Sequence, residues 1–433
     1  MPILDPKIET ANRETIRQTQ LERLQATVNR VHRNVAFYRE CFDRNGIDST
    51  QIRGLADLKR LPFTTREDLR RAYPYDMFAV PLRDIVRIHS TSGTTGKPIV
   101  VGYTKADLHV WASLTARVLT AAGIGATDFV QIAFNYNITT GGLGFHYGAE
   151  RLGGSVVPAS IEDIETQIRI MRDYKTTALV TAPGYALHIA AVLAEMGVTT
   201  KELHLKTAVL GSEPWSEGMR SQIEQGLGVK AFDNYGTTEI MGPGVSFECD
   251  ARCGLHVNED HFMVEVVDPV SNQLQPEGVV GELVFTTITK QGFPLIRYRT
   301  GDLASLTTDT CACGRTLARM GRVAGRSDDM IFVNGVSVMP SAIEQVLLEA
   351  EGIAPHYLIV LDRKAGVDEM EIQVEVPPLL ADDLGKLQRL GRGLQDAVAH
   401  RLGVASRVLF MEPKTIARST GGKVNRVIDR RKT

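Results

Sequence analysis

The middle of the chain alternates short apolar runs with segments of helical periodicity, and this pattern restricts the fold more than any other feature. Three runs of strand length are separated by two helical segments, in the order 178–181, 185–196, 207–210, 217–225 and 229–232. Short buried strands that alternate with helices indicate βαβ units and a largely parallel sheet. Ligands of such sheets bind at loops beyond the carboxyl ends of the strands. The polar loops at 211–214 and 233–239 are therefore candidate binding sites.

The sequence changes character on both sides of this region. Apolar residues at helical spacing predict a helix from about residue 12 to 43, and strand-like alternation begins near residue 263. Further strands and helices after residue 325 form a smaller unit of ordinary domain size. We therefore predict an α/β protein with a large N-terminal domain of mixed and parallel sheets with helices, residues 1–326, and a small α+β C-terminal domain, residues 327–433.

The charge balance argues against two classes of partner. The 433 residues include 49 Lys and Arg and 51 Asp and Glu, which gives a net charge of −2. This balance leaves no excess of basic residues to bind nucleic acid or an anionic membrane. The sequence also lacks an apolar stretch of the roughly 18 residues that a membrane span requires, and its start lacks the apolar core of a secretory signal. We expect a cytoplasmic protein that acts on small molecules, with no nucleic-acid or membrane partner.

The segment STSGTTGKP, Ser90–Pro98, is the most informative stretch of the chain. Five hydroxyls, two glycines and a lysine in nine residues suit an anion, because glycine lets backbone N–H groups approach closely and the side chains add donors. The candidate phosphate-binding residues are Ser90, Ser92, Gly93, Thr94, Thr95, Gly96 and Lys97. The segment is not a Walker A loop, since Thr91 and Pro98 occupy positions that this motif reserves for Gly and for Ser or Thr. A polar hairpin turn is the structural alternative.

Further motifs follow this loop and together carry a family resemblance. They are YGTTE at Tyr235–Glu239, YRTGD at Tyr298–Asp302, GRSDD at Gly325–Asp329 and GGKVNR at Gly421–Arg426. In this order they resemble the adenylate-forming acyl-CoA synthetase superfamily. The segments TTGGLGFHYGAERLGG, GSEPW and GRSDDMIFVNGVSVMP more closely resemble the phenylacetate–CoA ligases and related aryl-acid CoA ligases. The resemblance implies a large adenylate-forming domain and a small mobile C-terminal domain.

The resemblance also implies a two-step reaction. ATP and a carboxylate give an acyl-adenylate and pyrophosphate, and the thiol of coenzyme A then gives a thioester and AMP. ATP, Mg²⁺ and coenzyme A are the expected cofactors, and a homodimer is compatible with the family. One alternative is an aryl-acid adenylating enzyme that loads the thiol of a carrier protein. Another is a catalytically silent nucleotide-binding regulator.

The motifs assign the catalytic roles by resemblance. Glu239 is the expected Mg²⁺ ligand, and Thr238 matches the residue that contacts the α-phosphate. Lys423 matches the lysine that the small domain brings to the carboxylate and the α-phosphate for adenylation. Asp328 matches the hinge at which the small domain rotates between the two steps.

The nucleotide contacts follow in the same way. The expected walls of the adenine pocket are Ser212, Glu213, Pro214, Asp233, Asn234, Tyr235 and Gly236, and Thr237 is a further expected nucleotide-binding residue. Asp302 would accept hydrogen bonds from the ribose hydroxyls, because a carboxylate can accept two such bonds. Arg326 is a second nucleotide contact by resemblance.

The residues of the predicted acyl pocket leave two classes of acid as candidate substrates. By resemblance, the residues that line it are Tyr136, Asn137, Thr139, Gly141, Gly211, Tyr235, Gly242 and Pro243. Tyr136 could stack on an aromatic ring. Asn137 and Thr139 are polar where the family is apolar, and a polar lining selects substrates with a matching group. A substituted benzoate, such as anthranilate or another amino- or hydroxybenzoate, is therefore an alternative to phenylacetate.

Four of the five cysteines fall into two close groups. They form the patterns Cys249-x3-Cys253-x2-His256 and Cys311-x-Cys313, while Cys41 lies far away in the sequence. An odd number of cysteines without a signal peptide argues against disulfides, and Cys–His clusters are a common zinc signature. Some relatives resemble this chain at Cys249, His256, Cys311 and Cys313, which implies these four as Zn²⁺ ligands with Cys253 as the alternative. Ordinary buried thiols are the structural alternative.

Overall fold

The protein is described here by a computed structural model. The described residues are 2–91, 97–327, 330–350, 353, 356–364, 366–377, 380, 383–413, 415–416 and 426–432. The predicted site residues that lie outside them are Ser92, Gly93, Thr94, Thr95, Gly96, Asp328 and Lys423.

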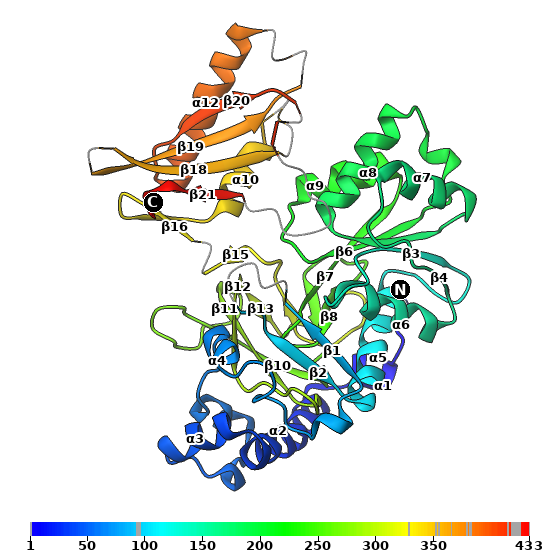
Figure 1. The fold of residues 1–433 in the computed structure, drawn as a ribbon, viewed down its shortest axis with the longest axis vertical. Helices are drawn as coiled ribbons and strands as arrows, with labels where there is room; N and C mark the ends of the chain where they lie inside the picture. The colour runs from blue at the N-terminus through cyan, green and yellow to red at the C-terminus, as the bar shows by residue number, and fades with distance from the viewer. Residues whose placement is uncertain are drawn as a thin grey trace.

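A nine-stranded sheet forms the centre of the large N-terminal part (Figure 1). Its first five strands run parallel, in the spatial order β4 (Ser155–Val157), β3 (Phe129–Ala133), β5 (Ala178–Thr181), β6 (Thr207–Gly211) and β7 (Lys230–Thr237). The sheet continues with antiparallel strands β8 (Gly242–Glu248), β9 (Leu255–Val257), β14 (Arg319–Met320) and β13 (Leu306–Thr307). The parallel sheet predicted from the apolar runs is confirmed.

Strand β7 differs from the prediction in its length. Residues 233–239 are predicted to form a loop, but β7 extends through Thr237. The reason is a long-range pairing: Tyr235 pairs with Ser246 and Thr237 pairs with Gly242 on β8. Only Thr238 and Glu239 of the YGTTE motif lie in the turn between the two strands.

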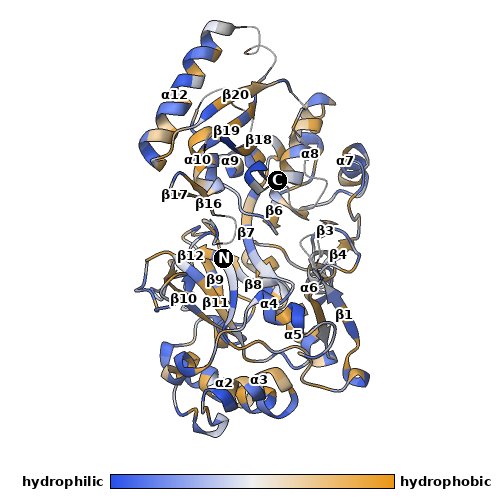
Figure 2. Ribbon diagram, turned by 60° about the vertical axis from the view of Figure 1, so that its left-hand side comes forward, coloured by the Kyte–Doolittle hydropathy of each residue, from blue (hydrophilic) through white to orange (hydrophobic). Residues whose placement is uncertain are grey.

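Helices pack on both faces of the parallel strands. Figure 1 shows α7 (Ile164–Asp173), α8 (Pro183–Glu195) and α9 (Glu217–Leu227) on one side, and α5 (Lys105–Ala121) and α6 (Gly141–Leu152) on the other. Residues of the sheet and these helices form one apolar core, in which Val130, Val180 and Ile189 are fully buried. The outer helix α7 is mainly hydrophilic (Figure 2), as expected for a helix that covers a sheet and faces water.

A second, antiparallel sheet lies beside the first. Its strands are β10 (Phe262–Val267), β11 (Gly281–Thr287), β12 (Tyr298–Ala304) and β15 (Gly325–Arg326). The preceding part of the chain packs around it as α2 (Arg13–Asn34), α3 (Ala36–Arg44), α4 (Arg66–Arg71) and the hairpin β1 (Arg87–Ser90) and β2 (Val100–Tyr103). The short helix α1 (Pro6–Glu9) lies instead against the loop between β13 and β14, where the Thr316 N–H donates to the Glu9 backbone oxygen. The single helix predicted over 12–43 is two helices, because Val35 adopts an extended conformation between them.

The smaller C-terminal part has its own sheet and core, and Figure 1 shows it at one end of the molecule. Its elements are β16 (Ile331–Val333), β17 (Val336–Val338), α10 (Pro340–Leu348), β18 (Tyr357–Lys364), β19 (Val367–Glu375), α12 (Leu384–Leu402), β20 (Arg407–Met411) and β21 (Val427–Asp429). The four-stranded sheet has the order β20-β19-β18-β21. The predicted combination of a large α/β part and a small α+β part is confirmed. No helix within the described ranges is both long enough and apolar enough to cross a membrane.

Candidate active site

The turn between β7 and β8 carries the carboxylate of Glu239, which is 5% exposed. Tyr298 on β12 donates a hydrogen bond from its hydroxyl to Glu239 Oε1 over 3.3 Å. Arg66 of α4 approaches the same oxygen, with 4.0 Å between Nε and Oε1. Segments from three distant parts of the chain therefore meet at this carboxylate.

Lys290 supports the same turn from the other side, and sequence reasoning missed it. Its Nζ donates to the backbone oxygens of Glu239, at 3.3 Å, and Ile240, at 2.8 Å. The hydroxyl of Tyr103 donates to the next carbonyl, that of Met241, at 2.9 Å. Complete burial lowers the pKa of Lys290 to about 7. The only sequence signal is a lysine within the largely apolar run TTITKQGFPLI.

Asp302 joins two other predicted nucleotide-binding residues, Tyr235 and Arg326. Tyr235 on β7 donates its hydroxyl hydrogen bond to Asp302 Oδ2 over 2.7 Å. Arg326 on β15 donates to Asp302 Oδ1 over 2.5 Å and to the backbone oxygen of Thr300 over 3.0 Å. The Tyr235 ring stacks on Phe285 with 5.9 Å between centroids, and burial raises the pKa of Tyr235 well above its ordinary value. The structure thus brings Tyr235, Asp302 and Arg326 together, as the motifs predict.

Both ends of the predicted phosphate loop are held by the hairpin of β1 and β2. Ser90 and Val100 are paired, and the backbone N–H of Ile99 donates to the hydroxyl of Thr91 over 3.0 Å. Lys97 is exposed, and its Nζ lies 5.9 Å from the centre of the Tyr73 ring. The intervening residues lie outside the described ranges, so the structure places only the two ends of this loop.

The predicted adenine-pocket residues either follow β6, as Ser212–Pro214 do, or lie within β7, as Asp233–Gly236 do. Ser212, with a left-handed φ of 77°, and Pro214 are exposed, whereas Glu213 accepts a hydrogen bond from the Gly184 N–H over 2.6 Å. Asp233 Oδ2 lies 3.4 Å from Arg322 Nε, a partner that the motifs did not indicate. Burial raises the pKa of the Asp233 carboxyl.

Close packing explains why glycine stands at positions 211 and 236. A Cβ on Gly211 would lie 2.4 Å from the backbone oxygen of Asn234, and one on Gly236 would lie 2.0 Å from the oxygen of Gly242. Asn234 is buried, and its Oδ1 accepts a hydrogen bond from the Gly244 N–H over 3.0 Å. No larger residue fits either glycine position without a shift of the strands.

Three of the predicted acyl-pocket residues, Tyr136, Asn137 and Thr139, lie between β3 and α6. The Tyr136 hydroxyl is hydrogen-bonded to His146 Nδ1 over 3.2 Å, and burial raises the pKa of Tyr136. Asn137 is exposed, and its Oδ1 accepts hydrogen bonds from both the backbone N–H and the hydroxyl of Thr139, at 3.0 and 2.8 Å. Thr139 therefore directs its backbone N–H and its hydroxyl to the side-chain oxygen of Asn137 in a local turn.

Trp111 of α5 is a second residue that sequence reasoning missed. Its indole N–H donates to the backbone oxygen of Pro243 over 3.0 Å. A Cβ on Gly242 would lie 2.6 Å from the indole ring, and one on Gly144 would lie 2.7 Å from it. The indole therefore sets how closely α6 and the start of β8 approach, which places Gly141 of α6 and Gly242 of β8 in the same region. The sequence alone offered no signal for this contact.

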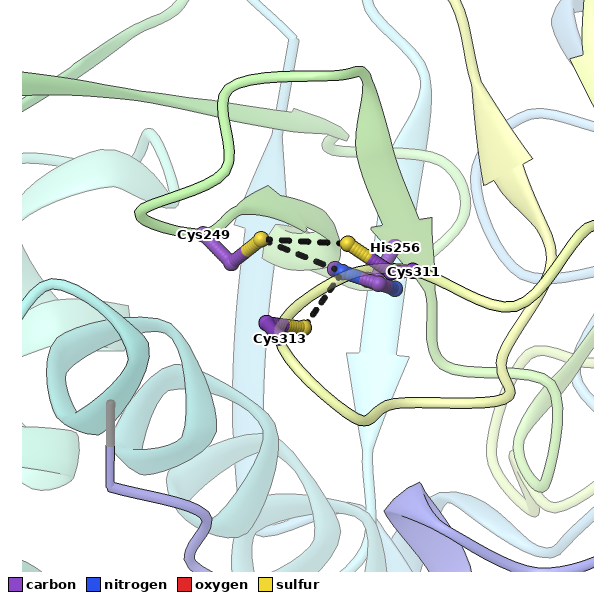
Figure 3. A group of neighbouring side chains, drawn as sticks. All are labelled: Cys249, His256, Cys311 and Cys313. Atoms are coloured by element: carbon purple, nitrogen blue, oxygen red, sulfur yellow. Dashed lines mark hydrogen bonds between the residues drawn. The ribbon is translucent and has the colours of Figure 1, made fainter.

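The four predicted zinc ligands converge at one place (Figure 3). Cys249 follows β8, His256 lies on β9, and Cys311 and Cys313 lie on the loop between β13 and β14. The sulfurs of Cys249 and Cys311 are 3.7 Å apart, and His256 Nε2 lies 3.4 Å from Cys249 Sγ and 3.5 Å from Cys313 Sγ. A tetrahedral site with ordinary Zn–S and Zn–N bond lengths has edges of about 3.8 Å between sulfurs and about 3.6 Å between sulfur and nitrogen. The donor set and its spacing therefore fit Zn²⁺.

The thiols of this cluster differ in acidity. Burial raises the pKa of Cys249 and of Cys311. Burial also opposes ionisation at Cys313, but hydrogen bonds with His256 and Arg315 outweigh it and lower the pKa of Cys313 to about 5. Cys253 is exposed and lies outside the group of four.

Comparison with known proteins identifies the family. The model for "AMP-binding enzyme" matches residues 16–289, and that for "AMP-binding enzyme C-terminal domain" matches residues 335–431. A phenylacetate-coenzyme A ligase of Thermus thermophilus is 46% identical over 441 residues, covering 99% of each chain. The chain belongs to the phenylacetate–CoA ligase family. This family membership confirms the class of reaction predicted from the motifs, that of an ATP-dependent, AMP-forming aryl-acid CoA ligase.

A related ligase of known structure has the same fold as this protein. The crystal structure of 2-hydroxyisobutyryl-CoA ligase in the postadenylation state, with an acyl-AMP, has a TM-score of 0.92 and 29% identity, covering 100% of this chain and 94% of that one. The same ligase in the thioesterification state, with its acyl-AMP and CoA, has a TM-score of 0.73 at the same coverage. The arrangement described here therefore resembles the postadenylation structure more closely. ATP, Mg²⁺ and coenzyme A follow from the family.

Proposed function

We propose that this ligase activates phenylacetate, or a closely similar arylacetate, as its acid. The two hydrogen bonds from Thr139 to Asn137 Oδ1 carry this choice, because they commit the Thr139 hydroxyl proton to a local turn and leave it no donor for a polar substituent on the substrate ring. The name of the relative at 46% identity supports the same acid. An amino- or hydroxybenzoate is the alternative outcome of the test below.

Glu239 and Thr238 are proposed to act on the phosphates of ATP. Mg²⁺ favours carboxylate and phosphate oxygens, and Glu239 presents a buried carboxylate beside Tyr298. Bound there, the ion would neutralise charge on the phosphates. The hydroxyl of Thr238 lies 3.2 Å from that of Thr140, at the start of α6. This contact links the proposed phosphate site to the proposed acyl site.

Asp302, with the loop that begins at Ser90, is proposed to hold the rest of the nucleotide. A carboxylate has about four acceptor positions, so Asp302 can keep its bonds with Tyr235 and Arg326 and still accept from a ribose diol. The exposed ammonium of Lys97 supplies positive charge at the end of the phosphate loop. Residues 212–214 after β6 and residues 233–236 of β7 would form the walls around adenine.

The small domain is proposed to begin after residue 326 and to rotate about Asp328, bringing Lys423 to the adenylation site. A separate apolar core, which includes Ile343, Ile359 and Val398, supports an independent unit. The match of the C-terminal family model to residues 335–431 supports the same division. A hinge at a loop residue between two compact units is a common mode of domain movement.

A structural Zn²⁺ is proposed at Cys249, His256, Cys311 and Cys313. The spacing of the four donor atoms supports it, and four protein ligands leave no open position for catalysis. Its contribution would be to tie the segment after β8 to the loop between β13 and β14. Cys253 is not proposed as a ligand, because its sulfur accepts a hydrogen bond from Arg319 at 2.6 Å and lies outside the group.

One experiment tests the acid, the acceptor and the lysine together. ATP–pyrophosphate exchange is measured with phenylacetate, anthranilate, 4-hydroxybenzoate and an alkyl acid, and product formation is then followed with CoA or a carrier protein. We expect phenylacetate and CoA to give the highest rates. Preference for a substituted benzoate would overturn the choice of acid, and loading of the carrier in place of CoA would overturn the acceptor.

Lys423→Ala is the matched variant for the lysine. We expect it to abolish exchange while thioester formation from supplied acyl-adenylate continues; equal loss of both steps would contradict the assigned role. A homodimer remains a further prediction, which sedimentation of the purified protein tests.

A further inference from the structure

Cys253 is the thiol that the proposed zinc site leaves over, yet it lies against that site. Its Sγ is 3.5 Å from the Sγ of Cys311. Cys253 is exposed, whereas Cys311 is buried. An exposed thiol therefore touches a buried sulfur that belongs to the proposed ligand set.

Arg319 fixes the position of this exposed thiol. Its Nη1 donates to the Sγ of Cys253 over 2.6 Å and to the backbone oxygen of the same residue over 2.7 Å. Arg319 itself is held in β14, where it pairs with His256 of β9. The contact anchors Cys253 to β14, the strand that pairs with His256 of the proposed metal site.

We propose that Cys253 is an oxidation site that a hydroperoxide modifies and that Cys311 then resolves as a disulfide. In the first step the O–O bond of the peroxide breaks, Cys253 becomes a sulfenic acid, and an alcohol or water leaves. In the second step the Cys311 thiol attacks the sulfenyl sulfur and gives up its proton, the S–O bond breaks, and the hydroxyl leaves with that proton as water. The two sulfurs together lose two electrons, and the peroxide gains them.

The geometry requires only a small movement. A disulfide has an S–S length of about 2.0 Å, so the two sulfurs must approach each other by roughly 1.5 Å from their separation of 3.5 Å. Cys41 lies on α3 in another part of the fold and does not compete for Cys253.

The consequence for the metal rests on the proposed zinc site, whereas the disulfide itself does not. A structural Zn²⁺ site uses four protein ligands, and oxidation of Cys311 would leave three. The site would then release its ion, and the link between the segment after β8 and the loop before β14 would be lost. A dithiol reductant and added Zn²⁺ would restore the metal site and the link between the two segments.

The test treats the purified full-length protein with hydrogen peroxide and reads two signals. Mass spectrometry of unreduced peptides maps disulfides, and a colorimetric chelator measures released zinc. Cys253→Ser is compared with Cys41→Ser, which removes a thiol remote from the cluster. We expect the wild type and Cys41→Ser to form the Cys253–Cys311 disulfide and release zinc, and Cys253→Ser to lose the linked peptide and keep its zinc at the same peroxide dose.

Two results would overturn the proposal. One is equal zinc release from the wild type and Cys253→Ser, and the other is a mapped disulfide that omits Cys253. If the purified protein contains no zinc, the zinc site fails, and the disulfide map alone then decides the role of Cys253.

Discussion

The Nζ of Lys290 lies 2.8 Å from the backbone oxygen of Ile240, so a fully buried ammonium group anchors the turn that carries Glu239. The segment after Lys290 is anchored in turn by Asp107 of α5. The Asp107 carboxylate accepts hydrogen bonds from the backbone N–H groups of Gln291, at 2.6 Å, and Gly292, at 2.9 Å. The position of the proposed Mg²⁺ ligand therefore depends on α5 as well as on β7 and β8.

Lys290→Met should weaken adenylation without unfolding the protein. The substitution leaves the carbonyls of Glu239 and Ile240 without their donor, at about 1–3 kcal/mol for each unsatisfied group. We expect a fall of roughly ten- to a hundredfold in ATP–pyrophosphate exchange, together with a higher Mg²⁺ requirement. Lys290→Arg, which keeps a donor, should lose less. An unchanged Mg²⁺ dependence in the Met variant would contradict the role of this contact.

Lys290 also predicts how stability depends on pH. Burial lowers its pKa to about 7 in the folded protein, while a lysine in an unfolded chain titrates near pH 10.4. Between these values the unfolded chain binds more protons than the folded one, so the contribution of Lys290 to the free energy of unfolding rises with pH. Below about pH 7 both states are protonated, and the penalty for the buried charge is fully present. As the pH is raised from about 6.5 to 9.5, the melting temperature of the wild type should therefore rise relative to that of Lys290→Met. Parallel curves of melting temperature against pH for the two proteins would exclude this titration.

Contiguous motifs could be predicted from the sequence, whereas single residues brought in by tertiary contacts could not. The residues Tyr235 and Glu239 lie within one pentapeptide, and the order of such segments carries the family resemblance. Lys290 and Trp111 act through long-range contacts, with the turn after β7 and with Pro243, and neither stands in a recognisable pattern.

The same distinction explains what was predicted of the fold. The period of apolar residues indicated the buried strands and their helices, because burial on both faces leaves a local pattern in the sequence. The extension of β7 through Thr237 depends on pairing with β8, a partner that local propensity does not reveal. The break at Val35 likewise follows from its backbone conformation in the packed structure, not from the helical spacing around it.

Asp302→Asn should impair nucleotide binding more than folding. The change removes the negative charge that accepts from Arg326 Nη1 and from the Tyr235 hydroxyl. Hydrogen bonds to charged groups contribute about 1.5–3 kcal/mol, so we expect roughly a ten- to a hundredfold loss in kcat/KM for ATP. Asp173→Asn, at an exposed position on α7, is the control and should leave the kinetics unchanged. Wild-type kinetics in the Asp302 variant would remove Asp302 from the nucleotide site.

Removal of metal should loosen the N-terminal segment as well as the cysteine loop. Arg315 forms a fully buried ion pair with Glu9, with 2.6 Å between Nε and Oε2, and it also donates to the Pro2 backbone oxygen and to Cys313 Sγ. Cys313 is a proposed zinc ligand, so loss of the ion would free the loop that positions Arg315. We expect chelator-treated protein to lose hydrogen-exchange protection at residues 2–16 together with residues 311–316.

Arg315→Met leaves the charge of Glu9 buried and unpaired. It should lower the free energy of unfolding in urea by about 3–5 kcal/mol and expose the same N-terminal residues with zinc still bound. Unchanged exchange at residues 2–16 after complete removal of zinc would show that this segment is held independently of the metal.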